Sequence, residues 1–256
     1  MAKDLTKRHA WTRDKTIVIL GLYCRIPFAK VNKNNPEIIR IAKLIEHSPS
    51  SVGMKIGNLG SCDEQLKAKG IKGLANCSKL DKDIWDEFSD NWKKLAQEAH
   101  KIETLTLSAL PLPKNISPEN VGKDIMRLTR QRINQFFFRK SVLSSYNETC
   151  CISKINEPKL LNASHIKPWS ACNPQEKVSP HNGLCLNVLH DRAFDRGLIA
   201  VDEKYRIRVS KELKNNSNNK VKAWIVDFAG KKITMPDKFL PSEKFLNWHI
   251  ENIFRG

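Results

Sequence analysis

Two segments carry most of the information in this chain: ASHIKPW at residues 163–169 and HNGLCLNVLHDRAFDRG at residues 181–197. The first predicts a short β-strand that ends near His165. Asn182 follows 17 positions later, and His190 lies eight positions beyond it on an expected short helix. His165, Asn182 and His190 are therefore the candidate site residues, although a single histidine at a strand end is more often structural.

The frame ASHIKPW…NGLCLNVLHDRAFDRGLI resembles the HNH nuclease motif, and in particular the HNH subfamily found in bacterial restriction-type endonucleases. The similarity continues upstream through residues 130–139 and 150–152 and into the tail at residues 248–254. Residues 11–100 are also similar to the N-terminal domain that accompanies such nucleases. The short motifs of that domain are WTR at 11–13, NPE at 35–37 and GIKGL at 70–74. The resemblance therefore covers most of the chain.

The resemblance implies a ββα-metal nuclease fold that hydrolyses phosphodiester bonds. Such hydrolysis needs a water made nucleophilic and a divalent cation that takes up charge on the phosphorane and the leaving 3′ oxygen. By resemblance, His165 is the general base and His190 binds the metal. Asn182 either braces the loop of the ββα unit or hydrogen-bonds the backbone of the base. One divalent ion, Mg²⁺ or Mn²⁺, is implied.

The residue before the base departs from the family pattern. Many HNH nucleases carry Asp or His there as a metal ligand, whereas this chain has Ser164, a weak neutral ligand for a hard cation. Either Ser164 binds the metal, directly or through water, or Asp195 supplies the missing carboxylate. Asp191 is the poorer candidate, because it is expected on another face of the helix.

The cysteines argue against a structural zinc ion. Many such nucleases add a zinc ribbon of paired Cys-x-x-Cys motifs, and Cys150, Cys151, Cys172 and Cys185 lack that spacing. The total of seven is odd, unlike the dense, even set of a small secreted scaffold. We therefore expect reduced thiols, with Cys151 and Cys185 in the core.

The chain is strongly basic. Its 256 residues include 44 Lys and Arg against 27 Asp and Glu, a formal net charge of +17 at pH 7. This balance excludes an acidic or neutral housekeeping enzyme and favours a polyanionic partner, because each cation that neutralises a phosphate releases counterions. The resemblance makes double-stranded DNA that partner. No stretch is apolar enough for a membrane span or a signal peptide, so we expect a cytoplasmic bacterial protein.

Residues 1–103 predict a helical domain. Asn35-Pro36 and Ser48-Pro49 each place a capping residue before a proline, which is the signature of a helix start. Two short helices joined by a tight turn suggest a helix-turn-helix. Its second helix is expected to present Lys55 and Asn58 to phosphates and base edges. The alternative is a helical hairpin with a solvated polar side.

The domain boundary is expected at residues 104–116, where TLTLSALPLPKNI has two prolines, no helical period and few charges. Before it, residues 81–101 predict an amphipathic helix that packs in the core. After it, residues 117–256 predict the HNH nuclease domain, with short strands among helices. The fold class is therefore α+β, a helical domain followed by a ββα-metal domain.

A long basic helix is expected to open the second domain. It places arginines among aromatic residues, a combination that can grip a nucleic-acid backbone, although a solvated basic face is the alternative. The predicted DNA contacts are Lys55, Asn58, Arg130, Arg132, Arg139 and Lys167.

These observations predict a metal-dependent DNA endonuclease of a restriction or defence system. Cutting both strands with one site per chain suggests a homodimer. One alternative is a DNA-binding regulator that has kept the nuclease fold without turnover, as the basic helical half and Ser164 suggest. A second is a nuclease that acts on RNA, because attack on a phosphodiester does not itself require DNA. Metal-dependent DNA cleavage separates the enzyme from the regulator.

Overall fold

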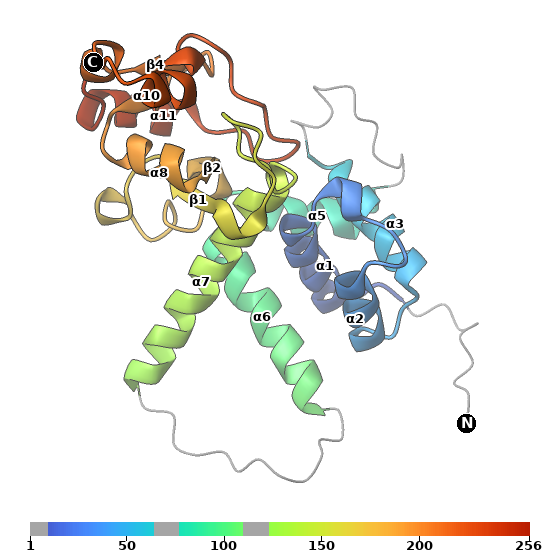
Figure 1. The fold of residues 1–256 in the computed structure, drawn as a ribbon. Helices are drawn as coiled ribbons and strands as arrows, with labels where there is room; N and C mark the ends of the chain where they lie inside the picture. Colours follow the sequence, from blue (N-terminus) through green and yellow to red (C-terminus); the bar gives the residue numbers. More distant parts are fainter. Residues whose placement is uncertain (1–9, 64–76, 110–122) are drawn as a thin grey trace. The chain divides into compact units, whose positions relative to one another are not determined.

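The chain forms two compact units, residues 1–137 and 138–256, which we describe separately. The structure, a computed structural model, describes residues 10–63, 77–109 and 123–256, without the side chains of residues 108–109 and 123–130. Figure 1 shows helices alone in the described part of the first unit and a mixture of helices and short strands in the second. The second unit therefore has the α+β character that the sequence predicts.

The described part of the first unit is a bundle of helices around α1. These helices are α1 (Arg13–Arg25), α2 (Pro36–Leu44), α3 (Pro49–Gly60), α5 (Lys79–Phe88) and α6 (Trp92–Ala109), with a 3-10 turn at Phe28–Lys30. α1 contacts α3, α5 and α6, and its residues from Thr16 to Cys24 are all buried. A helix that is buried on every side belongs in the centre of a bundle, so α1 forms the core of this unit.

Local capping determines where these helices begin. The side chains of Asn35 and Ser48 accept backbone N–H groups of the first turns of α2 and α3, and a proline follows each of them. Such a cap contributes about 1 kcal/mol to helix stability. Ser78 and Asp81 form a reciprocal capping box at the start of α5. The predicted starts of α2 and α3 are therefore confirmed.

α6 extends farther than the sequence suggested. It continues to Ala109, although the linker was predicted from residue 104. Thr104 and Thr106 fit this helix because their hydroxyls donate to backbone carbonyls one turn earlier. Residues 110–116 of the predicted linker lie outside the described residues. The division between the two compact units falls within α7 (Lys123–Ser145), between Phe137 and Phe138.

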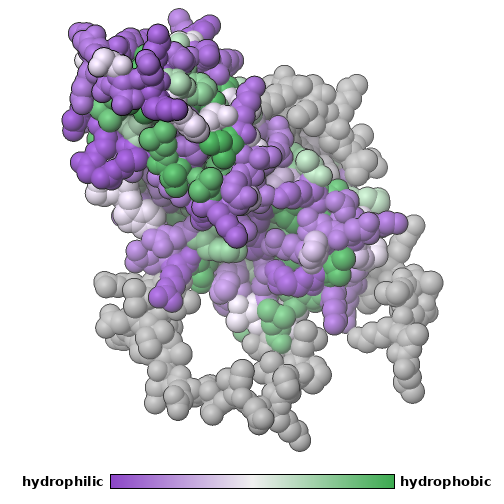
Figure 2. All heavy atoms as spheres, viewed as in Figure 1, coloured by the Kyte–Doolittle hydropathy of each residue, from purple (hydrophilic) through white to green (hydrophobic). Residues whose placement is uncertain are grey.

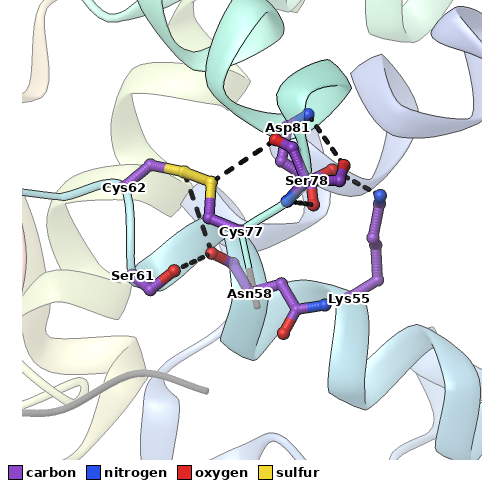
Figure 3. The surroundings of a disulfide bond; sticks show 7 residues. All are labelled: Lys55, Asn58, Ser61, Cys62, Cys77, Ser78 and Asp81. Carbon is purple, nitrogen blue, oxygen red and sulfur yellow. Dashed lines mark hydrogen bonds and ion pairs between the residues drawn. A yellow bond between two sulfur atoms is a disulfide. The ribbon is translucent and has the colours of Figure 1, made fainter. Parts of the chain in front are cut away.

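Lys55 does not lie on the exposed surface of α3, where the sequence predicted a DNA contact. α2 and α3 contact each other, but the Lys55 side chain is 4% exposed and its ammonium pairs with the Asp81 carboxylate of α5. The same ammonium lies 4.9 Å from the centre of the Trp11 ring. Figure 3 shows Lys55 reaching toward Asp81, and Asn58 is half-buried beside the end of α3. Lys55 therefore holds helices together rather than facing a ligand.

A disulfide joins Cys62, just after α3, to Cys77, just before α5 (Figure 3). It corrects the expectation that the thiols are all reduced. The two cysteines are 15 positions apart, and no spacing rule distinguishes such a pair from two separate thiols. The other five cysteines, Cys24, Cys150, Cys151, Cys172 and Cys185, are free and buried, as expected for Cys151 and Cys185.

Reduction of this disulfide is expected to destabilise the first unit. A crosslink between positions 15 apart removes conformational entropy from the unfolded chain, worth about 3 kcal/mol. Thermal unfolding with and without dithiothreitol measures the effect. The double variant Cys62→Ala/Cys77→Ala is the control, because dithiothreitol should not change its melting temperature. An equal response of the two proteins to the reductant would contradict the prediction.

The second unit is built on a ββα arrangement. The strand β1 (Leu161–His165) pairs antiparallel with β2 (Gly183–Asn187), and α8 (Val188–Asp195) follows β2 directly and contacts both strands. A second hairpin joins β3 (Ile199–Val201) to β4 (Ile207–Val209). The remaining helices are the C-terminal part of α7, α9 (Lys211–Lys214), α10 (Asn219–Trp224) and α11 (Glu243–Asn252). Short 3-10 turns lie at Pro158–Leu160, Trp169–Ala171, Pro180–Asn182 and Val226–Phe228.

The packing of α7 on the hairpin of β1 and β2 requires a glycine. Gly183 lies opposite His165, and a Cβ at this position would come within 2.3 Å of the Val142 side chain on α7. Only a residue without a side chain lets α7 pack this closely on the hairpin. The glycine therefore brings α7 against the strand end that carries His165.

The C-terminal helix α11 packs against the core of this unit. On α11, the His249 ring stacks on Phe194 of α8 with ring centres 3.8 Å apart, and its Nε2–H donates to the Phe194 carbonyl. This contact ties α11 to the ββα arrangement. Among the described residues, no helix is long and apolar enough to cross a bilayer.

Candidate functional site

His165 occupies the end of β1, where α7 and the following loop surround it. Its ring stacks on Phe138 of α7 with ring centres 3.7 Å apart, and it makes an edge-to-face contact with Trp169, with ring centres 5.6 Å apart. Its Nε2 lies 3.0 Å from the carbonyl oxygen of Lys177. The aromatic contacts and this hydrogen bond hold the ring in one orientation.

The hydrogen bond to Lys177 determines which nitrogen of His165 can accept a proton. A carbonyl oxygen only accepts, so Nε2 must carry the ring hydrogen and donate it. Nδ1 then keeps its lone pair, and it has no hydrogen-bond partner among the described residues. Burial lowers the pKa of His165 below its usual 6.5, which favours the neutral ring at neutral pH. The arrangement suits a general base.

Asn182 anchors the loop that follows His165. Its side chain is fully buried; Oδ1 accepts the backbone N–H of Lys167 at 2.8 Å, and Nδ2 donates to the Lys167 carbonyl at 3.2 Å. Nδ2 also lies within hydrogen-bond distance of the Glu176 carbonyl. Asn182 thus connects the two ends of the loop between β1 and β2, and it contacts backbone rather than open solvent.

Glu176 is a site residue that sequence reasoning missed. One carboxylate oxygen accepts from Lys167 Nζ at 2.8 Å and from the Asn173 backbone at 3.0 Å, and the other accepts from Lys244 Nζ at 3.1 Å. Burial acts to raise the pKa of Glu176, but these hydrogen bonds outweigh it and lower the pKa to about 2. A charged Glu176 therefore fixes the loop next to Lys177, whose carbonyl orients His165.

The pairing with Glu176 changes the role of Lys167. The sequence predicted a DNA contact, yet the Lys167 side chain is 15% exposed and its ammonium is engaged by the carboxylate. Arg139 is also engaged, because its guanidinium donates to the Leu161 carbonyl at 2.7 Å. Arg132 is exposed, and the Arg130 side chain lies outside the described residues. Among the described side chains predicted to contact DNA, Arg132 is exposed and forms no hydrogen bond with β1 or with the loop after it.

His190 lies in the interior of the second unit, at the start of α8. It is 0% exposed; Nε2–H donates to the Trp224 carbonyl at 2.8 Å, and Nδ1 faces the Asn187 amide at 3.1 Å. The Cys150 sulfur is 3.7 Å from the same Nδ1. Both ring nitrogens are therefore occupied by protein groups, and the contacts of His190 do not support its predicted role as a metal ligand.

The other predicted ligands do not complete a metal site either. Ser164 is buried, and its hydroxyl finds no hydrogen-bond partner in the described residues. Asn162 lies on the same face of β1 as Ser164, and its side chain donates to the Asp191 carboxylate at 2.7 Å. The carboxylate of α8 that contacts this strand is therefore Asp191, which the sequence ranked below Asp195. Partial burial and the nearby Asp191 raise the pKa of Asp195.

These contacts decide whether the predicted side chains could bind a divalent ion. Within the part of the chain that the structure describes, no group of three His, Cys, Asp or Glu side chains is placed to hold a metal ion. A cation at His190 would have to replace its hydrogen bond to Trp224 or to Asn187. The side chains as they are arranged do not fit the ion, and we assign no chemical step to it.

His190→Ala is expected to destabilise the second unit even in a chelator. The substitution leaves the Trp224 carbonyl without the ring donor and removes one of the two side-chain acceptors of the Asn187 amide, which keeps Ser153. The loss costs about 1–3 kcal/mol, and the substitution adds a cavity. Urea unfolding in EDTA measures this loss. A histidine that served only as a metal ligand would give the opposite pattern, with unchanged stability in EDTA and a loss only of the stabilisation by added metal.

Comparison with known proteins bears on this unit alone. Residues 150–202 match the family model described as HNH endonuclease. No curated protein matches the chain. The matched residues include β1, β2 and α8 with His165, Asn182 and His190. The ββα arrangement of the second unit is therefore that of an HNH endonuclease domain, which supports an HNH nuclease.

Proposed function

We propose that this protein is an endonuclease that hydrolyses phosphodiester bonds of double-stranded DNA, with His165 as the general base. The observation that carries the proposal is the orientation of His165, whose Nε2–H is fixed on the Lys177 carbonyl while Nδ1 keeps a lone pair. The basic net charge of +17 supports a polyanionic substrate. The resemblance to restriction-type nucleases supports a restriction or defence role.

In the proposed reaction, Nδ1 of His165 takes a proton from a water molecule as its oxygen attacks phosphorus. The bond between phosphorus and the leaving 3′ oxygen breaks, and that oxygen takes a proton from solvent. The Lys177 carbonyl stabilises the imidazolium that forms, because Nε2–H already donates to it. Phe138 keeps the ring in place through the stacking contact.

Dependence on Mg²⁺ or Mn²⁺ belongs to this proposal as well. HNH nucleases generally use a divalent metal ion. Because His190 is engaged by Asn187 and Trp224, metal binding would require this part of the site to rearrange.

The experiment is incubation of the full chain with supercoiled plasmid, linear duplex DNA and RNA, each in EDTA, Mg²⁺ or Mn²⁺. We expect metal-dependent cutting of the DNA, and discrete fragments would indicate sequence-specific recognition. Preferential cutting of RNA would overturn the assigned substrate. Methylated and unmethylated plasmids are both included, because a restriction enzyme can require or reject modified DNA.

A second candidate is a DNA-binding protein that has kept the HNH fold without turnover. The engaged ring nitrogens of His190 and the missing cluster of metal-binding side chains among the described residues favour it. Tight DNA binding with no cutting under any of these conditions would support this candidate and contradict the proposed nuclease.

A further inference from the structure

The segment that follows the matched residues is unusually basic. Residues 203–232 contain nine Lys and Arg and three Asp and Glu. All nine cationic side chains are exposed. They are Lys204, Arg206, Arg208, Lys211, Lys214, Lys220, Lys222, Lys231 and Lys232. Figure 2 shows hydrophilic residues over much of the surface where Figure 1 places β4 and α10.

Three of these cations share one face at β4, with Arg208 on the strand and Arg206 directly before it. Arg206 and Arg208 lie on either side of Ile207, which is buried. Because side chains alternate along a strand, the two arginines point to the same side, about 6.7 Å apart. Lys232 forms a backbone bridge directly opposite Arg206. We call Arg206, Arg208 and Lys232 the β4 face.

The like charges on the β4 face are poorly neutralised by the protein. Directly opposed cations on neighbouring strands are unfavourable. Arg206 donates to the Gly230 carbonyl, a neutral group, and Lys232 lies over the Tyr205 ring. In the residues that the structure covers, the carboxylate that pairs with this face is Asp202, 3.7 Å from Arg208, whose side chain is still 60% exposed. The face therefore remains positively charged and open to solvent.

We propose that the β4 face binds the phosphate backbone of duplex DNA. Two guanidinium groups on a paired strand can each bind a phosphate through two N–H groups, and a row of cations along an extended strand matches a chain of repeating anions. The face lies outside residues 150–202 that match the HNH family. We therefore assign it a role in binding DNA and no role in catalysis. This inference rests on the proposed function for its choice of DNA.

Equilibrium binding to a fluorescent DNA duplex tests the proposal, with the full chain in EDTA and at several salt concentrations. The variant Arg206→Gln/Arg208→Gln/Lys232→Gln should bind more than about tenfold more weakly near 0.15 M salt and lower the salt slope by about two to three, since each lost phosphate contact removes about 0.9. The matched control is Lys30→Gln/Lys33→Gln/Lys43→Gln, which removes the same charge from exposed positions of the first unit. Circular dichroism and thermal unfolding check that each variant folds like the parent.

The comparison of the two variants decides the proposal. A larger loss of affinity and salt slope in the β4 variant supports it. An equal loss in both variants would show a general effect of net charge, and an unchanged slope in the β4 variant would show no phosphate contact; either result overturns it. Displacement of the DNA by polyglutamate at equal charge concentration would also overturn it, because a simple polyanion would then suffice. Plasmid cutting by the parent protein is measured separately. The proposal for the β4 face can therefore be supported even if the protein binds DNA without cutting it.

Discussion

His165→Ala is expected to lower the rate of DNA cutting by a factor of about 10² to 10⁴, the usual contribution of a general base, while leaving DNA affinity nearly unchanged. The substitution removes Nδ1, a basic nitrogen at the end of β1 that the described contacts leave with a free lone pair. Single-turnover cleavage of a labelled duplex measures the rate, and anisotropy measures the affinity. Intact cutting by this variant would overturn the assignment of His165.

The pH dependence provides an independent check on His165. Burial lowers its pKa from 6.5, so the neutral, proton-accepting ring is present at pH 7 and is lost only as the pH falls below 6.5. The cleavage rate should therefore be level around neutral pH and fall on the acid side, with a midpoint below 6.5. A midpoint above 6.5 would contradict the assignment.

The control for these measurements is His100→Ala. His100 is exposed on α6 in the first unit and is not among the contacts described for His165. This variant should keep both the rate and the pH profile. Thermal unfolding of His165→Ala is also needed, because its ring stacks on Phe138 and its loss removes packing as well as chemistry. A folded but inactive His165→Ala with an active His100→Ala would support the general base.

Lys55→Met is expected to destabilise the first unit by about 3–5 kcal/mol, because it leaves the Asp81 carboxylate buried without its cation. Both side chains are almost inaccessible, at 4% and 0% exposed. Urea unfolding measures the loss. The double variant Lys55→Met/Asp81→Asn should recover much of it, since the introduced asparagine would be neutral and its amide oxygen could still accept the Ser78 N–H that Asp81 accepts now.

The matched control, Lys43→Met, removes an exposed lysine from α2 and should change stability by no more than about 0.5 kcal/mol. The sequence alone predicted that Lys55 contacts DNA, and that interpretation has a different signature. A Lys55→Met variant that keeps its stability but loses DNA affinity and salt dependence would restore the DNA contact and contradict the buried ion pair.

Sequence reasoning was most successful where neighbours along the chain settle the structure. The proline-led starts of α2 and α3 depend on Asn35 and Ser48, which cap N–H groups only two or three positions away. The hairpin of β1 and β2 and the helix α8 that follows it likewise form from one continuous segment. Residues 150–202 of that region match the HNH family, as the ASHIKPW and HNGLCLNVLHDRAFDRG segments indicated.

Tertiary contacts decided what several of the same residues do. Lys55 is buried because Asp81 comes from another helix, and Cys62 meets Cys77 across 15 positions. His190 is occupied by a carbonyl 34 positions away, and Lys167 is engaged by Glu176. Caps and strand alternation act over a few residues and are readable in order along the chain. The state of a charged or titratable side chain depends instead on which distant group replaces its water, and only the packed structure brings that group into contact.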